Sequence, residues 1–149
     1  MVRYRKTKPK KIILASDHAG FKLKEEVKKF LIKKRTKVLD LGTKNTNSVD
    51  YPDYAHLLSR KMKQGKNQFG ILICGSGTGM SMVANKHKNI RAALCYDIKS
   101  TKLSRLHNNA NVMTMGARLI NKNIAIKCVN TFLSTDFDGG RHYRRVKKI

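Results

Sequence analysis

The sequence predicts an α/β protein, a three-layer α/β/α sandwich of the Rossmann-like type with a five-stranded parallel sheet. Apolar, β-branched runs such as Ile71–Cys74 alternate with longer segments whose apolar residues recur at helical spacing. The chain has 149 residues, 40% of them hydrophobic, which is enough to bury the core of one domain. Strict alternation of strands and helices produces a parallel sheet that helices cover on both faces.

The N-terminal half supplies two strands and two helices. Residues 11–16 are expected to form an apolar strand, and residues 37–41 a second strand that Gly42 closes. Between them, a helix over 21–34 has one apolar face, made of Leu23, Val27, Phe30 and Leu31. A polar loop over 43–53 leads into the second helix, whose inward residues are Tyr54, Leu57, Leu58 and Met62.

The C-terminal half repeats this pattern. The third strand begins at Ile71, and a helix containing residues 80–86 follows it. Two further strands are expected over 91–96 and 112–115, the second ending at Gly116, and two further helices over 98–107 and 124–133. Ligands of open α/β sheets bind beyond the carboxyl ends of the strands. The polar residues at those ends are therefore the first candidates for a site: Asp17, His18, residues 74–79 and Asp97.

The two ends of the chain stand outside this alternation. Residues 1–10, with Pro9 among basic residues, predict a loose N-terminal arm, and residues 11–149 a single domain. Residues 141–149 suggest an exposed basic tail. The apolar run 12–15 is too short for a secretory signal, and no window reaches the length of a membrane-spanning helix.

Three cysteines, without a Cys-x-x-Cys pair or a His-x-His cluster, argue against both a disulfide framework and a structural zinc site. A cytoplasmic protein without a bound metal is expected. The net charge of +24 is typical of nucleic-acid-binding domains. However, lysines occur in every predicted helix, and Glu25 and Glu26 are the only glutamates. A lysine-biased, solvated surface is therefore favoured over functional binding of a polyanion.

Glycines at 75, 77 and 79 directly follow the third strand. Their GxGxG spacing is not the dinucleotide fingerprint, and the Gly-Lys-Ser/Thr ending of a P-loop is missing. A tight strand-to-helix turn is one interpretation. The other is a ligand cradle, in which backbone N–H groups and a helix N-terminus face an anion. The neighbouring Cys74 and the hydroxyls of Ser76 and Thr78 favour the cradle.

Cys74 differs from the other two cysteines in its surroundings. Cys95 lies in a predicted strand and Cys128 among the apolar residues of a predicted helix, so both are expected in the core. The glycines beside Cys74 leave space around its thiol, and the helix N-terminus that follows should favour a thiolate. Cys74 is thus a candidate nucleophile or base.

The remaining candidates each have a structural alternative. Asp17 could cap the first helix, although Asp17 and His18 together exceed what a cap requires. His107, Asn108 and Asn109 could terminate their helix, since histidine complements the helix dipole and asparagine serves as a C-cap. Residues 139–145, which include Arg141 and Arg145, could be a solvated tail or an arginine fork for a phosphate.

Taken together, these motifs resemble the ribose-5-phosphate isomerase B group, which includes the galactose-6-phosphate isomerase subunits. The resemblance extends from residue 11 to about residue 148. It rests on an ordered set of motifs: Ser-Asp-His-Ala-Gly-Phe at 16–21, Asp-Tyr-Pro-Asp-Tyr-Ala at 50–55, Ile-Cys-Gly-Ser-Gly-Thr-Gly at 73–79, Ala-Asn-Lys at 84–86, Leu-Ser-Arg-Leu-His-Asn at 103–108, Asn-Val-Met-Thr-Met-Gly-Ala-Arg at 111–118 and Gly-Gly-Arg-His at 139–142. Ser76 stands where many members have threonine, and the arm has no counterpart.

The resemblance implies metal-independent, cofactor-free interconversion of ribose 5-phosphate and ribulose 5-phosphate through an enediolate, a step of the pentose phosphate pathway. Cys74 would be the base, and His107, with Asp17 close by, would be the acid that opens the furanose ring. The substrate would be bound by His18, Gly75, Ser76, Gly77, Thr78, Gly79, Asn108, Arg118, Arg141 and Arg145. In this family the sugar site is shared between two subunits of a dimer, which implies a homodimer here; whether dimers pair into tetramers stays open at the level of sequence.

Two other functions remain open at the level of sequence. One is isomerisation of a six-carbon sugar phosphate, such as allose or galactose 6-phosphate, because the depth of the pocket decides the sugar. The other is a nucleic-acid-binding module, suggested by charge alone. RNA-recognition aromatics, zinc-finger spacing and a helix-turn-helix pattern are not evident. Nucleic acid is thus expected to bind only weakly, through charge.

Overall fold

A single parallel sheet forms the centre of the computed structural model, which describes residues 11–62 and 67–149. The expected arm at residues 1–10 lies outside the described residues. The strands are β1 (Lys11–Ser16), β2 (Val38–Asp40), β3 (Gln68–Cys74), β4 (Ala92–Leu94) and β5 (Val112–Gly116). Their order in the sheet is β2-β1-β3-β5-β4, and every neighbouring pair is parallel.

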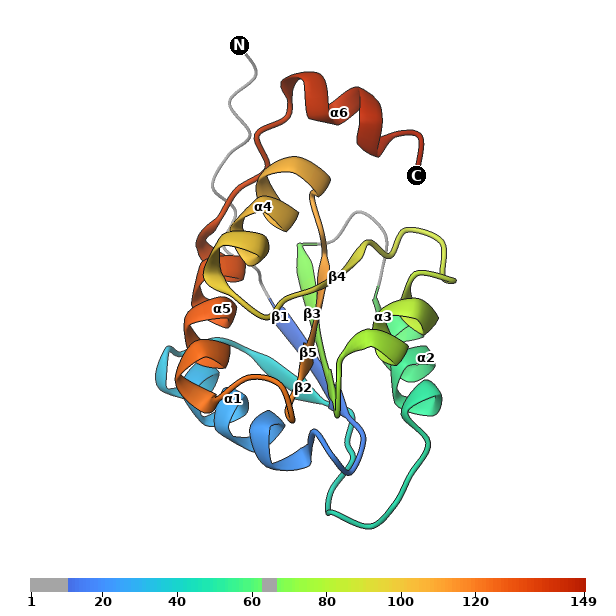
Figure 1. Cartoon of the computed structure of the whole chain (residues 1–149), viewed down its shortest axis with the longest axis vertical. Helices are drawn as coiled ribbons and strands as arrows, with labels where there is room; N and C mark the ends of the chain where they lie inside the picture. The colour runs from blue at the N-terminus through green and yellow to red at the C-terminus, as the bar shows by residue number, and fades with distance from the viewer. Residues whose placement is uncertain (1–10, 63–66) are drawn as a thin grey trace.

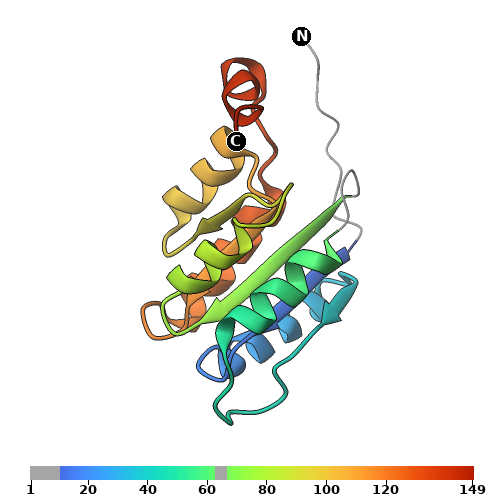
Figure 2. The same ribbon diagram turned by 90° about the vertical axis from the view of Figure 1, so that its right-hand side faces the viewer.

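Helices cover both faces of this sheet. They are α1 (Phe21–Lys33), α2 (Tyr51–Lys61), α3 (Thr78–Ala84), α4 (Ile98–Asn108), α5 (Lys122–Ser134) and α6 (Gly140–Val146). α1, α4 and α5 lie on one face, and α2 and α3 lie on the other (Figures 1 and 2). The predicted three-layer α/β/α sandwich with five parallel strands is confirmed. α6 stands apart, beyond the C-terminal end of α4 (Figure 1).

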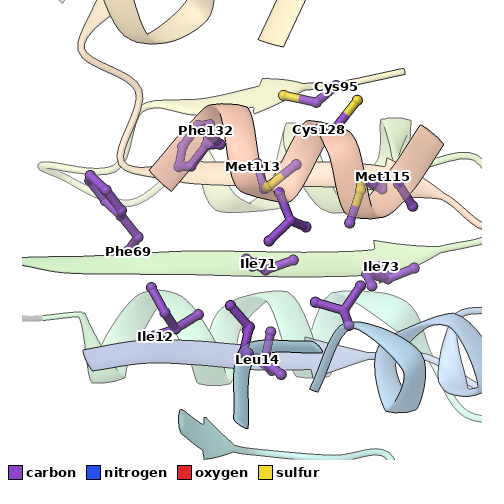
Figure 3. Close-up of a cluster of buried hydrophobic side chains, with 14 of the residues drawn as sticks. Ile12, Leu14, Phe69, Ile71, Ile73, Cys95, Met113, Met115, Cys128 and Phe132 are labelled. Atoms are coloured by element: carbon purple, nitrogen blue, oxygen red, sulfur yellow. The ribbon is translucent and has the colours of Figure 1, made fainter. Parts of the chain in front are cut away.

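Successive side chains of the strands pack alternately into two separate hydrophobic cores, one on each face of the sheet. Ile71 and Ile73 of β3 pack with α1 and α5, where Phe132 and Cys128 are fully buried (Figure 3). Leu72 and Cys74 point to the opposite face and pack with α2 and α3. Successive side chains of a strand point to opposite faces, so a central strand must be apolar at every position. Each fully buried Ile or Leu contributes about 1.5–3 kcal/mol.

Several boundaries differ from the sequence-based expectation; β3, for example, begins at Gln68 rather than at Ile71. The polar loop ends at Asp50 rather than Asp53, because Pro52 occupies the first turn of α2, where its missing N–H has no intrahelical partner to lose. Residues 140–146, expected to be part of a tail, form α6. None of the residues of α6 is buried, so the expected exposure is confirmed, and the helix itself is a feature that the sequence reasoning did not predict.

A buried lysine links α1 to β2. Lys24 is 1% exposed, and its Nζ lies 2.7 Å from one carboxylate oxygen of Asp40 and 2.8 Å from Glu25. Burial alone would raise the pKa of Asp40, but hydrogen bonds from Lys24 and Lys28 outweigh it and hold that pKa below its usual value. The ion pair thus compensates the buried ammonium, and it fixes the first turn of α1 against β2.

Gly20 sets the distance between the start of α1 and the end of β3. A Cβ at this position would lie 2.2 Å from the carbonyl oxygen of Ile73. We expect Gly20→Ala to lower the free energy of unfolding by about 1–3 kcal/mol, because the backbone has to move. Urea unfolding measures this loss. Ala19→Gly in the same turn is the control, with a cost of at most about 1 kcal/mol; equal effects of the two variants would contradict the prediction.

A histidine pair joins α2 to the segment after α3. Nδ1 of His56 and Nε2 of His87 are 2.7 Å apart. Burial first, then the proximity of His56 and Arg60, lowers the pKa of His87. The folded protein therefore favours the neutral form of His87. The contribution of neutral His87 to the stability of the fold is complete above the unfolded pKa of about 6.5, and it is lost as the pH falls below that value.

We expect thermal melts at about pH 7.5 and about pH 5.5 to show a larger loss of stability for the wild type than for His87→Gln. The lowered pKa of His87 fixes the direction of this difference, and His87→Gln removes the titrating group that causes it. Identical losses would contradict a lowered pKa of His87.

Candidate active site

The candidate site lies at the carboxyl ends of β1 and β3. After these two neighbouring strands the chain continues toward opposite edges of the sheet. β2 lies beyond β1, whereas β5 and β4 lie beyond β3. Such a reversal of strand order opens a crevice at the carboxyl ends of the two strands. Asp17 follows β1 there and Cys74 ends β3. The two segments are joined by a hydrogen bond of 3.2 Å from the backbone N–H of Asp17 to the carbonyl oxygen of Ile73.

The glycine loop closes directly over the thiol of Cys74. Its Sγ accepts a hydrogen bond of 3.1 Å from the backbone N–H of Gly77, and the residue is 4% exposed. Gly77 has a left-handed φ of +79°, and a Cβ there would lie 2.8 Å from the backbone carbon of Met115. Glycine is therefore required to bring this N–H to the sulfur. An N–H···S hydrogen bond is stronger when the sulfur is a thiolate.

Asp17 and His18 occupy fixed positions beside this loop. The carboxylate of Asp17, a residue that is 6% exposed, accepts a hydrogen bond of 2.9 Å from the N–H of Gly20, which is itself the N-cap residue of α1. Nδ1 of His18 lies 3.2 Å from both the N and the O of Val49. The ring of His18 is thus held by its Nδ1 side, so its Nε2 side is the one that can meet a ligand.

Arg118 and Tyr51 flank the two ends of the glycine loop. The Arg118 guanidinium lies 3.1 Å from the point where a Cβ of Gly75 would stand. The backbone N–H of Arg118 donates a hydrogen bond of 3.0 Å to the carbonyl oxygen of Gly75. The ring of Tyr51 lies 2.6 Å from the corresponding point of Gly79. Sequence reasoning had missed Tyr51 as a site residue. The motif at residues 50–55 was the signal that could have found it.

A second group of candidates lies at the far end of α4. His107 is in its last turn, and Asn109 ends the helix at a φ of +48°. The His107 ring stacks on that of His142 from α6, with centroids 4.2 Å apart and planes 8° from parallel. Asn108, Arg141 and Arg145 are exposed beside them. Asn109 is thus the C-cap of α4, as expected if this segment simply ends the helix. His107, by contrast, is stacked on His142.

Arg105 holds this end of α4 in place. Its guanidinium is buried and lies 4.6 Å from the centre of the Phe69 ring. It donates one hydrogen bond to the carbonyl oxygen of Thr135 and another to Oδ1 of Asn109, each of 3.1 Å. Burial lowers the pKa of Arg105 to about 10, so it remains charged near neutral pH. The last turn of α4 and the segment leading to α6 are therefore tied to one cation.

One chain does not bring its two groups of candidates together. α4 runs back to the amino end of the sheet, where Asn111 precedes β5, whereas Cys74 is paired with Gly116 at the carboxyl end of β5. The length of β5 alone separates the amino end of the sheet, near the end of α4, from the carboxyl end, where Cys74 lies, by about 13 Å. The candidates therefore form two clusters. The first contains Asp17, His18, Cys74, Gly75–Gly79 and Arg118, and the second contains His107, Asn108, Arg141 and Arg145.

His107, His142 and Asp138 also offer three ligand atoms within 4.8 Å of one another. A metal ion must lie in the plane of each imidazole that binds it, about 2.0–2.1 Å from the nitrogen. The two rings here are parallel and stacked, so no point lies in both planes at that distance. In this arrangement the cluster suits mutual stacking rather than chelation.

The other cysteines are core residues, as expected. Cys95 and Cys128 are fully buried, and all three cysteines are free. Burial raises the pKa of Cys95 to about 11 and also raises that of Cys128, so neither forms a thiolate near neutral pH. Cys74 is thus the cysteine that lies at a strand end against a donor loop.

None of the helices within residues 11–62 and 67–149 is both long and apolar enough to cross a lipid bilayer.

The fold and the site define an α/β enzyme domain with a thiol, a carboxylate and a cradle of N–H donors at a strand-order reversal. The model of the Ribose/Galactose Isomerase family matches residues 12–149. The chain belongs to the ribose/galactose isomerase family.

Its relatives include proteins of known structure and name. Ribose-5-phosphate isomerase B of Escherichia coli is 41% identical over 140 residues, which cover 94% of this chain and 94% of that protein. A ribose 5-phosphate isomerase structure from Thermotoga maritima is 51% identical, with a TM-score of 0.89, and the match covers 93% of this chain and 95% of that one. Ribose-5-phosphate isomerase B from Mycoplasma genitalium, solved with bound ribulose-5-phosphate, is 43% identical with a TM-score of 0.89, and the match covers 93% and 92% of the two chains.

Proposed function

We propose that this protein interconverts ribose 5-phosphate and ribulose 5-phosphate. The observation that carries the proposal is the Cys74 thiol, which accepts the N–H of Gly77 inside the glycine loop. Moving a proton between two neighbouring carbons requires a base and a set of donors for the charge that develops on oxygen. Membership of the family supports the proposal, and the relative with bound ribulose-5-phosphate supports the choice of sugar.

The reaction first has to open the furanose ring. The hydroxyl on C1 loses its proton, the bond between C1 and the ring oxygen O4 breaks, and O4 takes a proton from His107. An aldehyde forms at C1. Asp17 faces the same crevice as Cys74 and is the carboxylate that can receive the hydroxyl proton. A positioned acid or base contributes about 10²–10⁴-fold to such a step.

Proton transfer at carbon follows. The Cys74 thiolate removes the proton from C2, and a double bond forms between C1 and C2 with negative charge on O1. The backbone N–H groups of Gly75 to Gly79 stabilise that charge, each donor contributing about 3–4 kcal/mol in comparable sites. Return of the proton to C1, protonation of O1 and loss of the proton on O2 leave the ketone of ribulose 5-phosphate.

The phosphate does not react, so it serves to hold the sugar. Arg141 and Arg145 are four residues apart on α6 and therefore lie on one side of the helix. Two guanidinium groups in that arrangement suit phosphate oxygens. His18, Asn108 and Arg118 complete the set of substrate-binding groups in the proposal. Binding energy from the phosphate keeps the reacting carbons in the productive geometry.

A two-fold symmetric homodimer brings the two clusters together. A five-carbon sugar with its phosphate spans roughly 8 Å, which is shorter than the separation of the clusters within one chain. In the proposed dimer, His107, Arg141 and Arg145 of one subunit face Cys74 of the other, and symmetry creates two equal sites.

Exposed apolar residues on elements at the carboxyl edge of the sheet suit a subunit contact. They are Met82, Tyr96 and Leu119, which are 65%, 57% and 68% exposed. Pairing of dimers into tetramers is a further part of the proposal.

A six-carbon sugar phosphate is the alternative substrate within the same chemistry. It would need one more carbon between the glycine loop and the arginines of α6. We place the enzyme in the cytoplasm, since its three cysteines are all unpaired, buried thiols.

The activity is tested by incubating the protein with ribose 5-phosphate in the presence of EDTA and following ribulose 5-phosphate by NMR. Turnover that survives EDTA is expected. Parallel assays with allose 6-phosphate and galactose 6-phosphate rank the sugars by kcat/KM. A protein that turns over neither class of sugar phosphate would contradict the proposed function, and a higher kcat/KM for a six-carbon sugar would replace ribose 5-phosphate as the substrate.

A further inference from the structure

We propose that His142 is a positioning residue for ring opening: its imidazole stacks on that of His107 and holds it in the orientation that delivers a proton to the ring oxygen. The inference rests on the proposed function, in which His107 is the acid. His142 itself is not assigned a contact with the sugar.

The geometry of the two rings carries this inference. Their centroids are 4.2 Å apart and their planes are 8° from parallel, so the rings overlap face to face. Both residues are half-buried, whereas Asn108, Arg141 and Arg145 around them are exposed. Stacking contact between the two rings restricts rotation about χ2 of both histidines, a torsion that is otherwise broad. His107 is thus the side chain of this cluster whose direction is fixed before a substrate arrives.

The backbone supports the same arrangement. The N–H of Asp138 donates to the carbonyl oxygen of Leu106 at 3.1 Å, which joins the segment before α6 to the residue preceding His107. Gly139 then has a φ of +65° and starts the turn into α6. The carbonyl oxygen of Gly139 accepts the N–H of His142 at 2.9 Å. The position of His142 over His107 is therefore set by local backbone contacts and does not depend on a ligand.

The charged groups around His142 favour a neutral ring. His107 faces it from α4, Arg141 and Arg145 from α6, and Asp138 from the segment before α6. Loss of hydration first, then the repulsion from His107 and the two arginines, lowers the pKa of His142 against the opposing effect of Asp138. A neutral imidazole stacked on a protonated one is attractive, whereas two protonated rings repel. A neutral His142 thus stacks on His107 without charge repulsion at the moment when His107 carries the proton that it donates.

The test separates ring opening from proton transfer at carbon. Ribulose 5-phosphate is acyclic because its O5, which would close the ring on C2, carries the phosphate. Exchange of deuterium from D2O into C1 of ribulose 5-phosphate therefore requires Cys74 but no ring opening. We expect His142→Ala to lower turnover of ribose 5-phosphate by about 10- to 100-fold, the effect of a misplaced catalytic group, while the exchange rate stays within about twofold.

A conservative variant and a double mutant complete the design. His142→Phe keeps a flat ring that can stack and should restore most of the turnover. His142→Ala should have little further effect when His107 is already Asn, since a positioning residue acts only through its partner. His56→Ala, which removes a histidine from the other histidine pair on the opposite face of the sheet, is the control and should leave the ratio of turnover to exchange unchanged.

Other outcomes would overturn the inference. Equal losses of turnover and exchange in His142→Ala would mean that His142 binds substrate or maintains the fold, and unchanged turnover would mean that the stack has no role. A His142→Phe variant as impaired as His142→Ala would mean that the imidazole nitrogens matter rather than the stack. A wild-type protein without turnover would contradict the proposed function instead, which is a separate result.

Discussion

Replacing Cys74 with alanine is expected to lower kcat for ribose 5-phosphate by about 10²–10⁴-fold, the contribution of a positioned general base. KM should change little, because the phosphate-binding groups are untouched. Cys74→Ser should be almost as impaired, since a hydroxyl does not ionise near neutral pH. Steady-state assays at one pH, with EDTA present, measure the loss.

Cys128→Ala is the matched control for this variant. Cys128 is fully buried in the other core, between α5 and the sheet, and its pKa is raised by burial. The change should lower stability slightly and leave kcat unchanged. Turnover retained by Cys74→Ala would remove Cys74 from the mechanism, and an equal loss in both cysteine variants would indicate a general effect on folding.

Mixing two inactive variants is expected to restore activity. In the proposed dimer, each site combines Cys74 of one subunit with His107 of the other. A mixed dimer of Cys74→Ala and His107→Asn chains therefore has one site with both native residues and one site with neither. Random exchange makes half of the dimers mixed, with one intact site of two, so about a quarter of the wild-type activity should return.

The experiment requires unfolding and refolding the two variants together, and each variant treated alone is its control. Activity should rise from about 1% or less of the wild-type value to near a quarter, a change that no error in protein concentration can mimic. No recovery in a mixture that contains mixed dimers by native mass spectrometry would contradict the shared site. It would leave the role of Cys74 itself intact.

Most of the fold was predictable because its signals are local. The apolar run of β3 and the apolar faces of α1 and α5 depend on the spacing of neighbouring residues, and their positions agree with the structure to within a few residues. Lys24 was not predictable as a buried residue. Its burial depends on Asp40, which lies sixteen positions away and meets it only once β2 pairs with β1.

The candidate site divides in the same way. Cys74 and the glycine loop were recognised because a thiol, three glycines and two hydroxyls are contiguous in the chain. Tyr51 was missed, since only the approach of α2 to α3 brings its ring against Gly79. His142 was missed for the same reason. Its significance comes from the stack on His107, 35 positions earlier, and not from its neighbours in the sequence.

The sequence by itself determined the class of fold, the strand ends that carry polar residues and, through its ordered motifs, the family. Each of these depends on periodicity or on short contiguous motifs. Only the tertiary structure decided the order of the strands, which places Asp17 beside Cys74 and leaves His107 at the opposite end of the sheet. Strand order depends on which distant segments pair and pack, and no short window of sequence contains that information. The division of the candidate residues into two clusters, and with it the case for a site shared by two subunits, follows from that order.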